Sequence, residues 1–419
     1  MAFAAVLIDA RVYDAQAMRS AGAELLSLAL MDARTRTLGW LAAFEGLALP
    51  EERADLDPPW WLAGQAAWFQ EYWIARHVQR GRGVAADPGG LRLASIEPRA
   101  DAWFDPLVGS RAQRWRQPPP ETTDLQTYLA ATLETTLDLL DKAGTGDDAL
   151  HVFRAALQHE DRLGEALAVA VQALDLGPER HAALLALGLW PALPSRSRRD
   201  PLWFPGQTVR LGSTAGGFVP EAEQGAHAVQ LAEFEMDAQG VSWSQFAEFA
   251  NDGGYDDRRW WTDAGWAMLA ASGRRAPRYV EQMVGGVLAQ RQGRLQRLPL
   301  VQAVLHVSAH EAAAWCNWAG RRLPSEAEWT LAAATASARG FVWGEALEWV
   351  AGRAGRYPGA AGKPAAPERV AGAAAGSPAW RVLRGASAWA SPRLRHAQAR
   401  RFAAAEHDEL FVGFRSCAV

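Results

Sequence analysis

The feature that most constrains the fold of this chain is a helical periodicity confined to its first half. Between about residues 17 and 45, apolar side chains recur at every third or fourth position, which predicts a long amphipathic helix. Three further stretches share this pattern, each with proline, acidic residues or glycine at its ends: residues 58–80, 123–144 and 146–178.

The ends of these stretches and the connection between them suggest how the helices pack. Thr123 or Asp124 is expected to cap the third helix, and Asp147 or Asp148 the fourth, because short polar side chains satisfy the free N–H groups of a first turn. Residues 80–120 are rich in Gly, Pro and Asp and predict one long crossing connection. Four amphipathic helices with one such connection predict a four-helix bundle.

A stretch rich in proline and arginine, residues 191–206, interrupts the helical pattern. Beyond it the predicted elements are short, with strands around 209–211 and 228–234 and two helices that open on capping boxes. These boxes pair Ser308 with Glu311 and Ser325 with Glu328. The chain is therefore predicted to be α+β, with a helical bundle at 17–190, a linker at 191–206 and a second domain at 207–419.

Composition narrows the classes of partner and compartment. The chain has 43 basic and 47 acidic residues and a net charge of −4, with no basic block, so we expect no nucleic-acid partner. Cys316 and Cys417 are its two cysteines, which excludes a disulfide framework and fits a reducing compartment. No apolar run reaches the roughly 20 residues of a bilayer span, and the N-terminus lacks a basic signal-peptide region. We therefore expect a cytoplasmic protein with no membrane partner.

The segment QHEDRLGE, residues 158–165, is the most telling candidate for chemistry. His159 and Leu163 are four apart and so share one helix face. A histidine there could ligate a metal, but a lone buried histidine is more often a core residue. The remaining histidines, among them His306 and His310, are expected to be surface or capping residues in most cases. Cys316 and Cys417 are expected to be small hydrophobic residues rather than nucleophiles.

The chain lacks two common motifs of catalysis and phosphate binding, and it contains one basic stretch that could bind a ligand. No serine-nucleophile elbow and no glycine-rich phosphate loop is present. Residues 273–297 are basic and interleaved with apolar residues. A solvated hairpin is the first interpretation of this stretch, and binding of an anionic ligand is the second.

The second half contains several motifs of one known family. They are VSWSQFAEFANDGGY (241–255), VSAHEAAAWCNWAGRRLPSEAEW (307–329), RVLRGASAW (381–389) and LFVGFRSC (410–417). Together they cover roughly 200 residues and resemble the formylglycine-generating-enzyme domain, also called the sulfatase-modifying-factor domain. The resemblance implies a C-type-lectin-like fold of small sheets, helices and irregular segments.

The first half resembles the DinB-like four-helix bundle of the ergothioneine sulfoxide synthases, and most closely their selenoneine synthase branch. The residues that carry this resemblance are WLAGQAAWFQEYWIARHVQRGRGVAADP (61–88) and ALHVFRAALQHEDRLGEAL (149–167). It implies a nonheme Fe(II) cofactor that uses O2 to join sulfur or selenium to trimethylhistidine. The implied partners are a zwitterion of that kind and a thiol or selenol donor.

Transferred residue by residue, the family's iron ligands fall on Gln65, His159 and Leu163. Glutamine is a weak ligand for Fe(II) and leucine is none. The family's active-site tyrosine has no counterpart after Tyr357. A substrate-binding asparagine corresponds to Arg401, and polar residues after it become Ala403 and Ala404.

We therefore name His159 and Gln65 as candidate metal ligands, and Arg162 and Arg401 as candidate substrate-binding residues. Three hypotheses remain open. The chain is a diverged family member that is noncatalytic or impaired and binds a small zwitterion or an active paralogue. Alternatively, it is an active synthase with a relocated metal. The third hypothesis is a changed reaction that uses Glu160, Asp161 and Arg162. Formylglycine generation is not expected, because the reactive cysteine pair of that activity has no counterpart.

Overall fold

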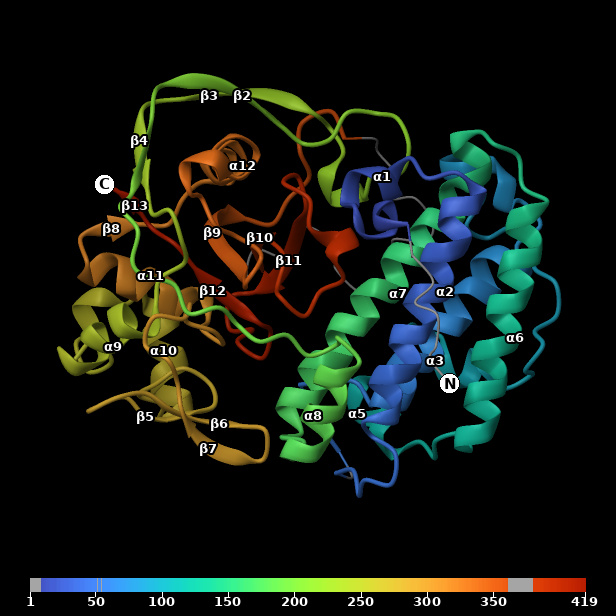
Figure 1. Cartoon of the computed structure of the whole chain (residues 1–419), viewed down its shortest axis with the longest axis horizontal. Coiled ribbons are helices and arrows are strands. Elements are labelled where there is room, and N and C mark those ends of the chain that lie inside the picture. Colours follow the sequence, from blue (N-terminus) through green and yellow to red (C-terminus); the bar gives the residue numbers. More distant parts are fainter. Residues whose placement is uncertain (1–8, 51, 54, 361–379) are drawn as a thin grey trace.

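Long helices and short strands occupy different parts of the computed structural model, which describes residues 9–50, 52–53, 55–360 and 380–419. Figure 1 shows the helices of the first half on one side and the small sheets of the second half on the other. The predicted α+β class is confirmed.

The helical part is a bundle of four helices. They are α2 (Ala23–Ala42), α3 (Pro59–Gln70), α6 (Thr122–Asp141) and α7 (Asp147–Ala173). α7 packs against α2 and α3, and α6 packs against the same pair. Every residue of α3 is buried, so α3 is surrounded on all faces. It continues into one π-helical turn, η2 (Glu71–Ala75).

Several helix ends differ from the sequence prediction. The helix expected from 17 to 45 is two helices, α1 (Ala15–Arg19) and α2, because Gly22 is extended and starts a new helix. The fourth helix ends at Ala173, where Asp175 takes a left-handed φ of 50°. A separate helix, α8 (Pro178–Ala186), then begins with proline in its first turn.

The predicted caps of the third and fourth helices are also corrected. The N-cap positions are Glu121 and Gly146, and neither makes a side-chain capping bond. Asp124, Asp147 and Asp148 lie inside the first turns instead. Their charges favour these helix starts through the helix dipole rather than by capping.

The connection across 80–120 carries short helices of its own. They are η3 (Arg80–Ala85), α4 (Ala100–Phe104) and α5 (Arg111–Arg116). One further turn, η1 (Ala10–Tyr13), precedes α1.

The described residues of the second half form four small sheets. The first has the order β1 (Leu202–Phe204), β4 (Phe234–Met236), β13 (Cys417–Ala418) and β8 (Arg321–Arg322). The second has the order β11 (Arg400–Ala404), β10 (Trp380–Gly385), β9 (Leu347–Arg353) and β12 (Val412–Phe414), with β12 parallel to β9. The others are β2 (Gln207–Leu211) with β3 (His227–Leu231), and β5 (Val280–Gln282), β6 (Leu288–Arg291) and β7 (Arg294–Arg297).

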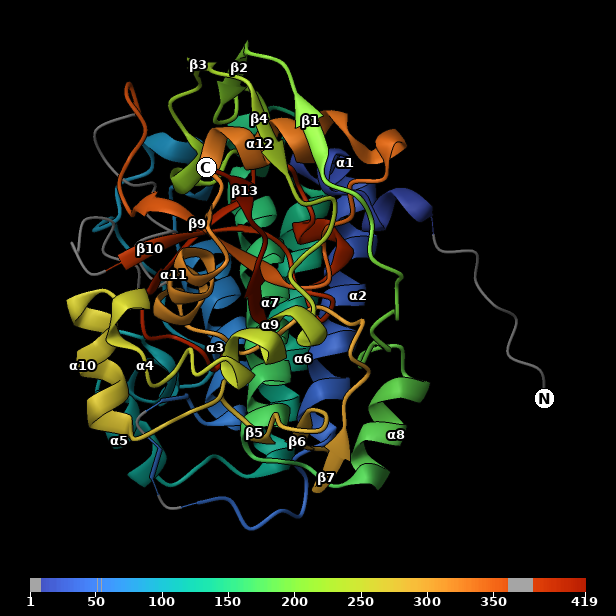
Figure 2. The same cartoon turned by 90° about the vertical axis from the view of Figure 1, so that its left-hand side faces the viewer.

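Helices α9 (Trp243–Asn251), α10 (Asp263–Ser272), α11 (Ala309–Trp318) and α12 (Glu326–Thr335) surround these sheets. Short turns join them: η4 (Glu221–Glu223), η5 (Arg258–Trp260), η6 (Ser337–Arg339) and η8 (Pro392–Leu394). Figure 2 shows β5, β6 and β7 near α8 at one end of the molecule.

Local predictions for this half hold well. Both predicted capping boxes are present, and Ser242 with Gln245 adds a third at the start of α9. The predicted hairpin within 273–297 is the β6–β7 pair. Residues 351–380 are rich in Ala, Gly and Pro, which favours a loop. Most of this stretch lies outside the described residues, although its first residues, up to Arg353, belong to β9.

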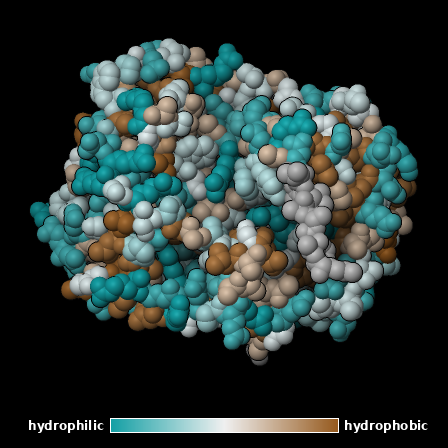
Figure 3. Space-filling view, viewed as in Figure 1, coloured by the Kyte–Doolittle hydropathy of each residue, from teal (hydrophilic) through white to brown (hydrophobic). Residues whose placement is uncertain are grey.

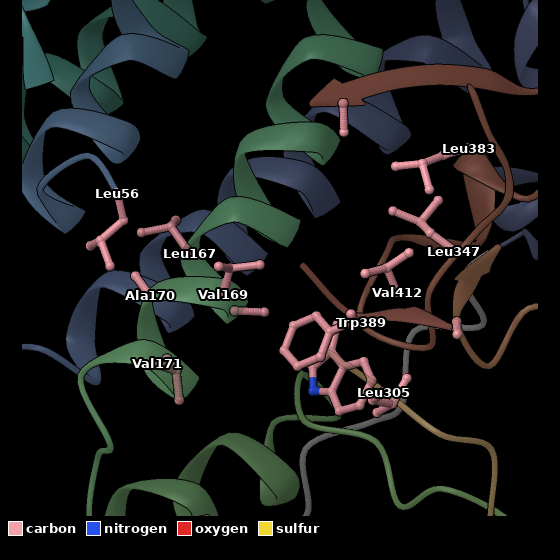
Figure 4. Packing of buried hydrophobic residues seen from close by; sticks show 14 of the residues in the cluster. Leu56, Leu167, Val169, Ala170, Val171, Leu305, Leu347, Leu383, Trp389 and Val412 are labelled. Carbon is pink, nitrogen blue, oxygen red and sulfur yellow. The ribbon is translucent and has the colours of Figure 1, made fainter. Parts of the chain in front are cut away.

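A continuous hydrophobic cluster joins the two halves. It contains Leu167 and Val169 of α7 together with Leu305, Trp389 and Val412 of the second half. Figure 4 shows Trp389 between the α7 side chains and those of the sheet. Burying apolar area of this kind contributes about 25 cal/mol per Å², so the bundle and the sheets stabilise each other.

Some apolar side chains gather on the surface beside α8. On the face shown in Figure 3, hydrophobic residues gather in the lower middle, where α8 lies. Leu185 and Leu187, at the end of this helix, are each more than half exposed. Within the described residues, no helix combines the length and the apolar character that a bilayer span requires.

A buried ion pair crosses the same interface. Arg393 of η8 donates from Nε and Nη2 to both carboxylate oxygens of Asp161 on α7, each at 2.8 Å. Its Nη1 donates to Asp32 of α2 at 2.7 Å. The side chains of Arg393 and Asp161 are each 2% exposed, so neither charge is solvated and each depends on the other.

We predict that Arg393→Met lowers the free energy of unfolding by about 3–5 kcal/mol, because it leaves Asp161 buried without a countercharge. Urea unfolding followed by tryptophan fluorescence measures this. The matched control is Arg258→Met, which removes an exposed pair with Asp263 and should leave the unfolding midpoint close to that of the wild type. Equal stability of the two variants would contradict the prediction.

Candidate functional site

The two candidate metal ligands lie side by side. Gln65 on α3 and His159 on α7 contact each other through Oε1 and Nε2. The amide oxygen can only accept a hydrogen bond, so the neutral imidazole donates from Nε2. Phe69 stacks on the His159 ring at 4.1 Å with an interplanar angle of 18°. The ring is thus fixed on one face by an aromatic side chain and at its edge by an amide.

The surroundings keep His159 neutral. Burial, together with the positive charge of Arg162, lowers its pKa from 6.5 to about 3. A neutral imidazole is the form that ligates metals. Its Nε2 atom, however, is already engaged with Gln65.

Leu163 is the third position of the set and lies one turn further along α7. Its side chain is 9% exposed and belongs to the hydrophobic cluster between the two halves. The three positions therefore supply one imidazole, one amide that pairs with it, and one hydrocarbon. Fe(II) with open coordination positions needs more nitrogen or oxygen donors than this, so these side chains do not fit the iron that the resemblance implies.

A search of the described residues for other donors gives no alternative set. No group of three or more His, Cys, Asp or Glu side chains is placed there to hold a metal ion. The two cysteines are free and buried. Burial raises the pKa of Cys417 to about 12 and also raises that of Cys316. Both thiols are therefore protonated at neutral pH, in agreement with the prediction that they are small hydrophobic residues.

The two candidate substrate-binding residues lie near one carboxylate, Glu165 of α7. This carboxylate accepts hydrogen bonds from Arg401 on β11 and from the hydroxyl of Ser387. Arg162 precedes Glu165 by three positions and so lies on the same side of α7. The structure thus joins α7 to the second half at the contact of Glu165 with Arg401, which we call the α7–β11 contact.

This contact has an excess of positive charge. Arg395 is a second guanidinium in the field of Glu165, and burial lowers its pKa. Arg395 and Arg401 therefore both act on this one carboxylate. The Arg401 side chain remains 23% exposed, so part of it stays accessible. An arrangement of this kind favours a ligand that brings a further carboxylate.

The acidic candidates for a changed reaction have structural partners. Glu160 accepts from Arg34 at 2.7 and 3.1 Å, and also from Thr37 and Gln70. It is 1% exposed and lies inside the bundle. Asp161 is paired with Arg393. Both carboxylates are saturated by hydrogen bonds, so neither is free to act as a general base.

Sequence reasoning missed some residues of this region and misjudged others. Ser387 falls within the quoted motif RVLRGASAW, which gave a signal for the fold but none for its contact with α7. His306 and His310 were predicted to be surface or capping residues. They are instead 3% and 8% exposed, because α10 and neighbouring aromatic side chains cover the start of α11.

Comparisons with known proteins agree with this architecture. A profile of the sulfatase-modifying factor enzyme 1-like domain matches residues 190–366. A hercynine oxygenase of Mycolicibacterium thermoresistibile is 30% identical over 328 residues, covering 77% of this chain and 69% of the relative. The hercynine oxygenase of Mycolicibacterium smegmatis is 31% identical over 333 residues, or 77% and 73% of the two chains. A formylglycine-generating enzyme of Streptomyces coelicolor is 31% identical over 175 residues, covering 38% of this chain and 54% of the relative.

The depressed pKa of His159 predicts how acid affects stability. The unfolded chain takes up a proton near pH 6.5, whereas the folded chain resists protonation down to about pH 3. Stability contributed by the neutral ring is therefore complete above pH 6.5 and falls on acidification, by up to about 1.4 kcal/mol per pH unit. In His159→Asn this loss is absent, so the stability advantage of the wild type should shrink between pH 6.5 and about pH 5.

Urea unfolding at several pH values measures this difference. His407→Asn, at a ring that is 38% exposed, controls for the change from histidine to asparagine. Parallel pH profiles for the wild type and His159→Asn would show that the ring is not held neutral by its surroundings.

Proposed function

This chain belongs to the hercynine oxygenase family, and we propose that it is a binding member of that family. It holds a small zwitterion that bears a carboxylate at the α7–β11 contact, without iron-dependent oxygen chemistry at His159. The observation that carries this proposal is the direct contact of Gln65 with His159. That contact occupies the imidazole nitrogen which a metal would otherwise take.

The donor chemistry around His159 supports the first part of the proposal. Oxygen activation needs a metal that is held firmly and still has open positions. Gln65 and Leu163 cannot supply the two missing nitrogen ligands. Leu163 also packs in the hydrophobic cluster, so this face of α7 contributes to stability rather than to metal binding.

The charge around Glu165 supports the second part. Hercynine, the compound in the relatives' name, is trimethylhistidine and carries a carboxylate. The partly exposed Arg401 supports this assignment, because a guanidinium can form charge-assisted hydrogen bonds with such a carboxylate. Arg162, three positions before Glu165, is proposed as the second residue that binds it. A bound zwitterion of this kind would be retained rather than oxidised. It could then be passed to an active paralogue that adds the thiol or selenol donor.

A second candidate function is a synthase with its metal bound elsewhere in the chain. The family membership favours it, because the resemblance implies nonheme iron. Direct measurement of iron binding separates the two functions.

We predict that the purified wild-type protein takes up no stoichiometric Fe(II) under anaerobic conditions, whereas Gln65→His with Leu163→His binds about one equivalent. The double variant restores three imidazoles on α3 and α7, a donor set that suits Fe(II). Metal analysis after gel filtration and anaerobic titration measure the stoichiometry. The control is Gln65→Asn with Leu163→Met, which changes both positions without adding an imidazole.

Tight one-to-one binding by the wild type would overturn the proposal and support the synthase with a relocated metal. Iron in neither protein, with both variants folded, would mean that the α3–α7 geometry itself does not suit the metal.

We predict that hercynine binds the wild-type protein and that Arg401→Gln weakens this binding by about tenfold or more, the usual effect of losing a charged contact to a carboxylate. Isothermal titration calorimetry measures the affinity. Arg353→Gln, at an exposed arginine on β9, is the matched control and should bind like the wild type. Equal affinity of the wild type and Arg401→Gln would place the ligand elsewhere or show that it does not bind.

A further inference from the structure

A cavity of ≈ 280 Å³ lies between the two halves, away from His159. Its walls come from five separate places in the chain: Gln172 near the end of α7, Trp190 after α8, Arg291 of the β6–β7 hairpin, His306 before α11, and Trp389. Gln172 is seven positions beyond Glu165 on the same helix, which at 1.5 Å per residue is about 10 Å. The residues that line the cavity do not include Glu165, Ser387 or Arg401, so the cavity is distinct from the α7–β11 contact.

Three buried polar atoms around this cavity have no hydrogen-bond partner among the described residues. They are Nδ1 of His306, Nε1 of Trp389 and Nη2 of Arg291. His306 is 3% and Trp389 5% exposed. Buried polar groups in native proteins are nearly always hydrogen-bonded. Three such atoms on residues that line one cavity make its wall partly polar.

The charge of the cavity is positive. Arg291 has no ion pair within the described parts of the chain, although burial lowers its pKa to about 10. A carboxylate of the same region, Asp175, accepts from Gln290 and from the backbone of Gly293 instead. Burial, with the nearby Arg291 charge, lowers the pKa of His306 to about 3. At neutral pH the lining thus has two cations, Arg291 and Arg297, together with one indole donor and one neutral imidazole.

The rest of the wall is aromatic. Trp389 stacks on Phe411 with ring centroids 3.6 Å apart and an interplanar angle of 9°. Trp190 meets the Trp389 ring edge-on at 5.4 Å and the Phe411 ring at 6.0 Å. Figure 4 shows the Trp389 indole beside Leu305, a further apolar residue of the wall. Flat apolar groups pack well against surfaces of this kind.

His306, on the cavity wall, has an unusual backbone conformation. Its φ is 61°, a left-handed conformation that few residues other than glycine adopt. Tyr279 stands edge-on to the ring at 4.8 Å. Unusual backbone conformations of this kind persist where the surroundings enforce them, commonly at binding sites. Here the conformation keeps the imidazole at the cavity wall.

We propose that this cavity binds a small carboxylate with a flat apolar body. Arg291 pairs with the carboxylate, Trp389 donates its indole N–H to it, and the aromatic wall receives the ring. Because α7, the chain after α8 and the hairpin all border the cavity, a bound ligand would also join the bundle to the second half. This site does not depend on the proposed function at the α7–β11 contact.

The test uses the full-length protein and two probes of the same shape, 2-naphthoate and the neutral 2-naphthamide. Isothermal titration calorimetry should show 2-naphthoate binding to the wild type about tenfold or more tightly than the amide. Arg291→Gln should remove this preference, so that both probes bind alike. Arg294→Gln, an exposed arginine of the same hairpin, is the control and should behave like the wild type.

A second variant keeps the test decisive if Arg291→Gln fails to fold, which its thermal melting curve would reveal. Trp389→Phe retains an aromatic ring and removes the indole N–H, so it should weaken 2-naphthoate binding by a few-fold. Equal affinity of the wild type for the two probes, or no binding at millimolar concentration, would overturn the proposal. It would also be overturned if Arg401→Gln abolished binding while Arg291→Gln did not.

Discussion

The contact of Arg393 with Asp161 and Asp32 sets the relation between the two halves of the molecule. Arg393 binds Asp161 through two nitrogens, and both side chains are excluded from water. Such a pair tolerates little displacement, because each charge depends on the other's geometry. It therefore fixes both the rotation of α7 about its axis and its position along the second half. Glu165, one turn further on, then meets Ser387 and Arg401.

The same rotation of α7 separates its side chains by role. Glu160 faces the bundle and is held by Arg34, while Asp161 and Glu165 face the second half. His159 and Leu163 share a third direction, toward α3 and the hydrophobic cluster. A leucine at position 163 adds buried apolar area, worth about 1.5–3 kcal/mol when complete. The scaffold thus gains stability at a position where the family resemblance places a metal ligand. Replacing a functional residue by an apolar one commonly raises stability and lowers activity.

Sequence reasoning succeeded where the cause of a structure is local. The capping boxes at Ser308 and Ser325 form within four residues, and helical periodicity needs only neighbouring turns. It failed where the cause is distant. Glu165 and Arg401 are far apart in the chain, and nothing near either residue indicates the other. His306 precedes a helix as a capping residue would, yet Tyr279 and Phe411 cover it. The resemblance named Gln65 and His159 as candidate ligands, but the sequence left open whether their side chains face each other, and the structure brings them into contact.

The two interdomain sites differ in a way that argues for separate roles. At the α7–β11 contact Arg401 is already paired with Glu165, so a ligand there competes with an existing ion pair. At the cavity lined by Arg291, three buried polar atoms have no partner among the described residues, so a ligand there would supply hydrogen bonds without breaking any. The first arrangement favours weak and exchangeable binding, because the displaced pair offsets part of the gain. The second favours firm retention, because each new bond relieves a buried donor or acceptor. A molecule held in the cavity would therefore act more as a structural element of the interface than as a passing substrate.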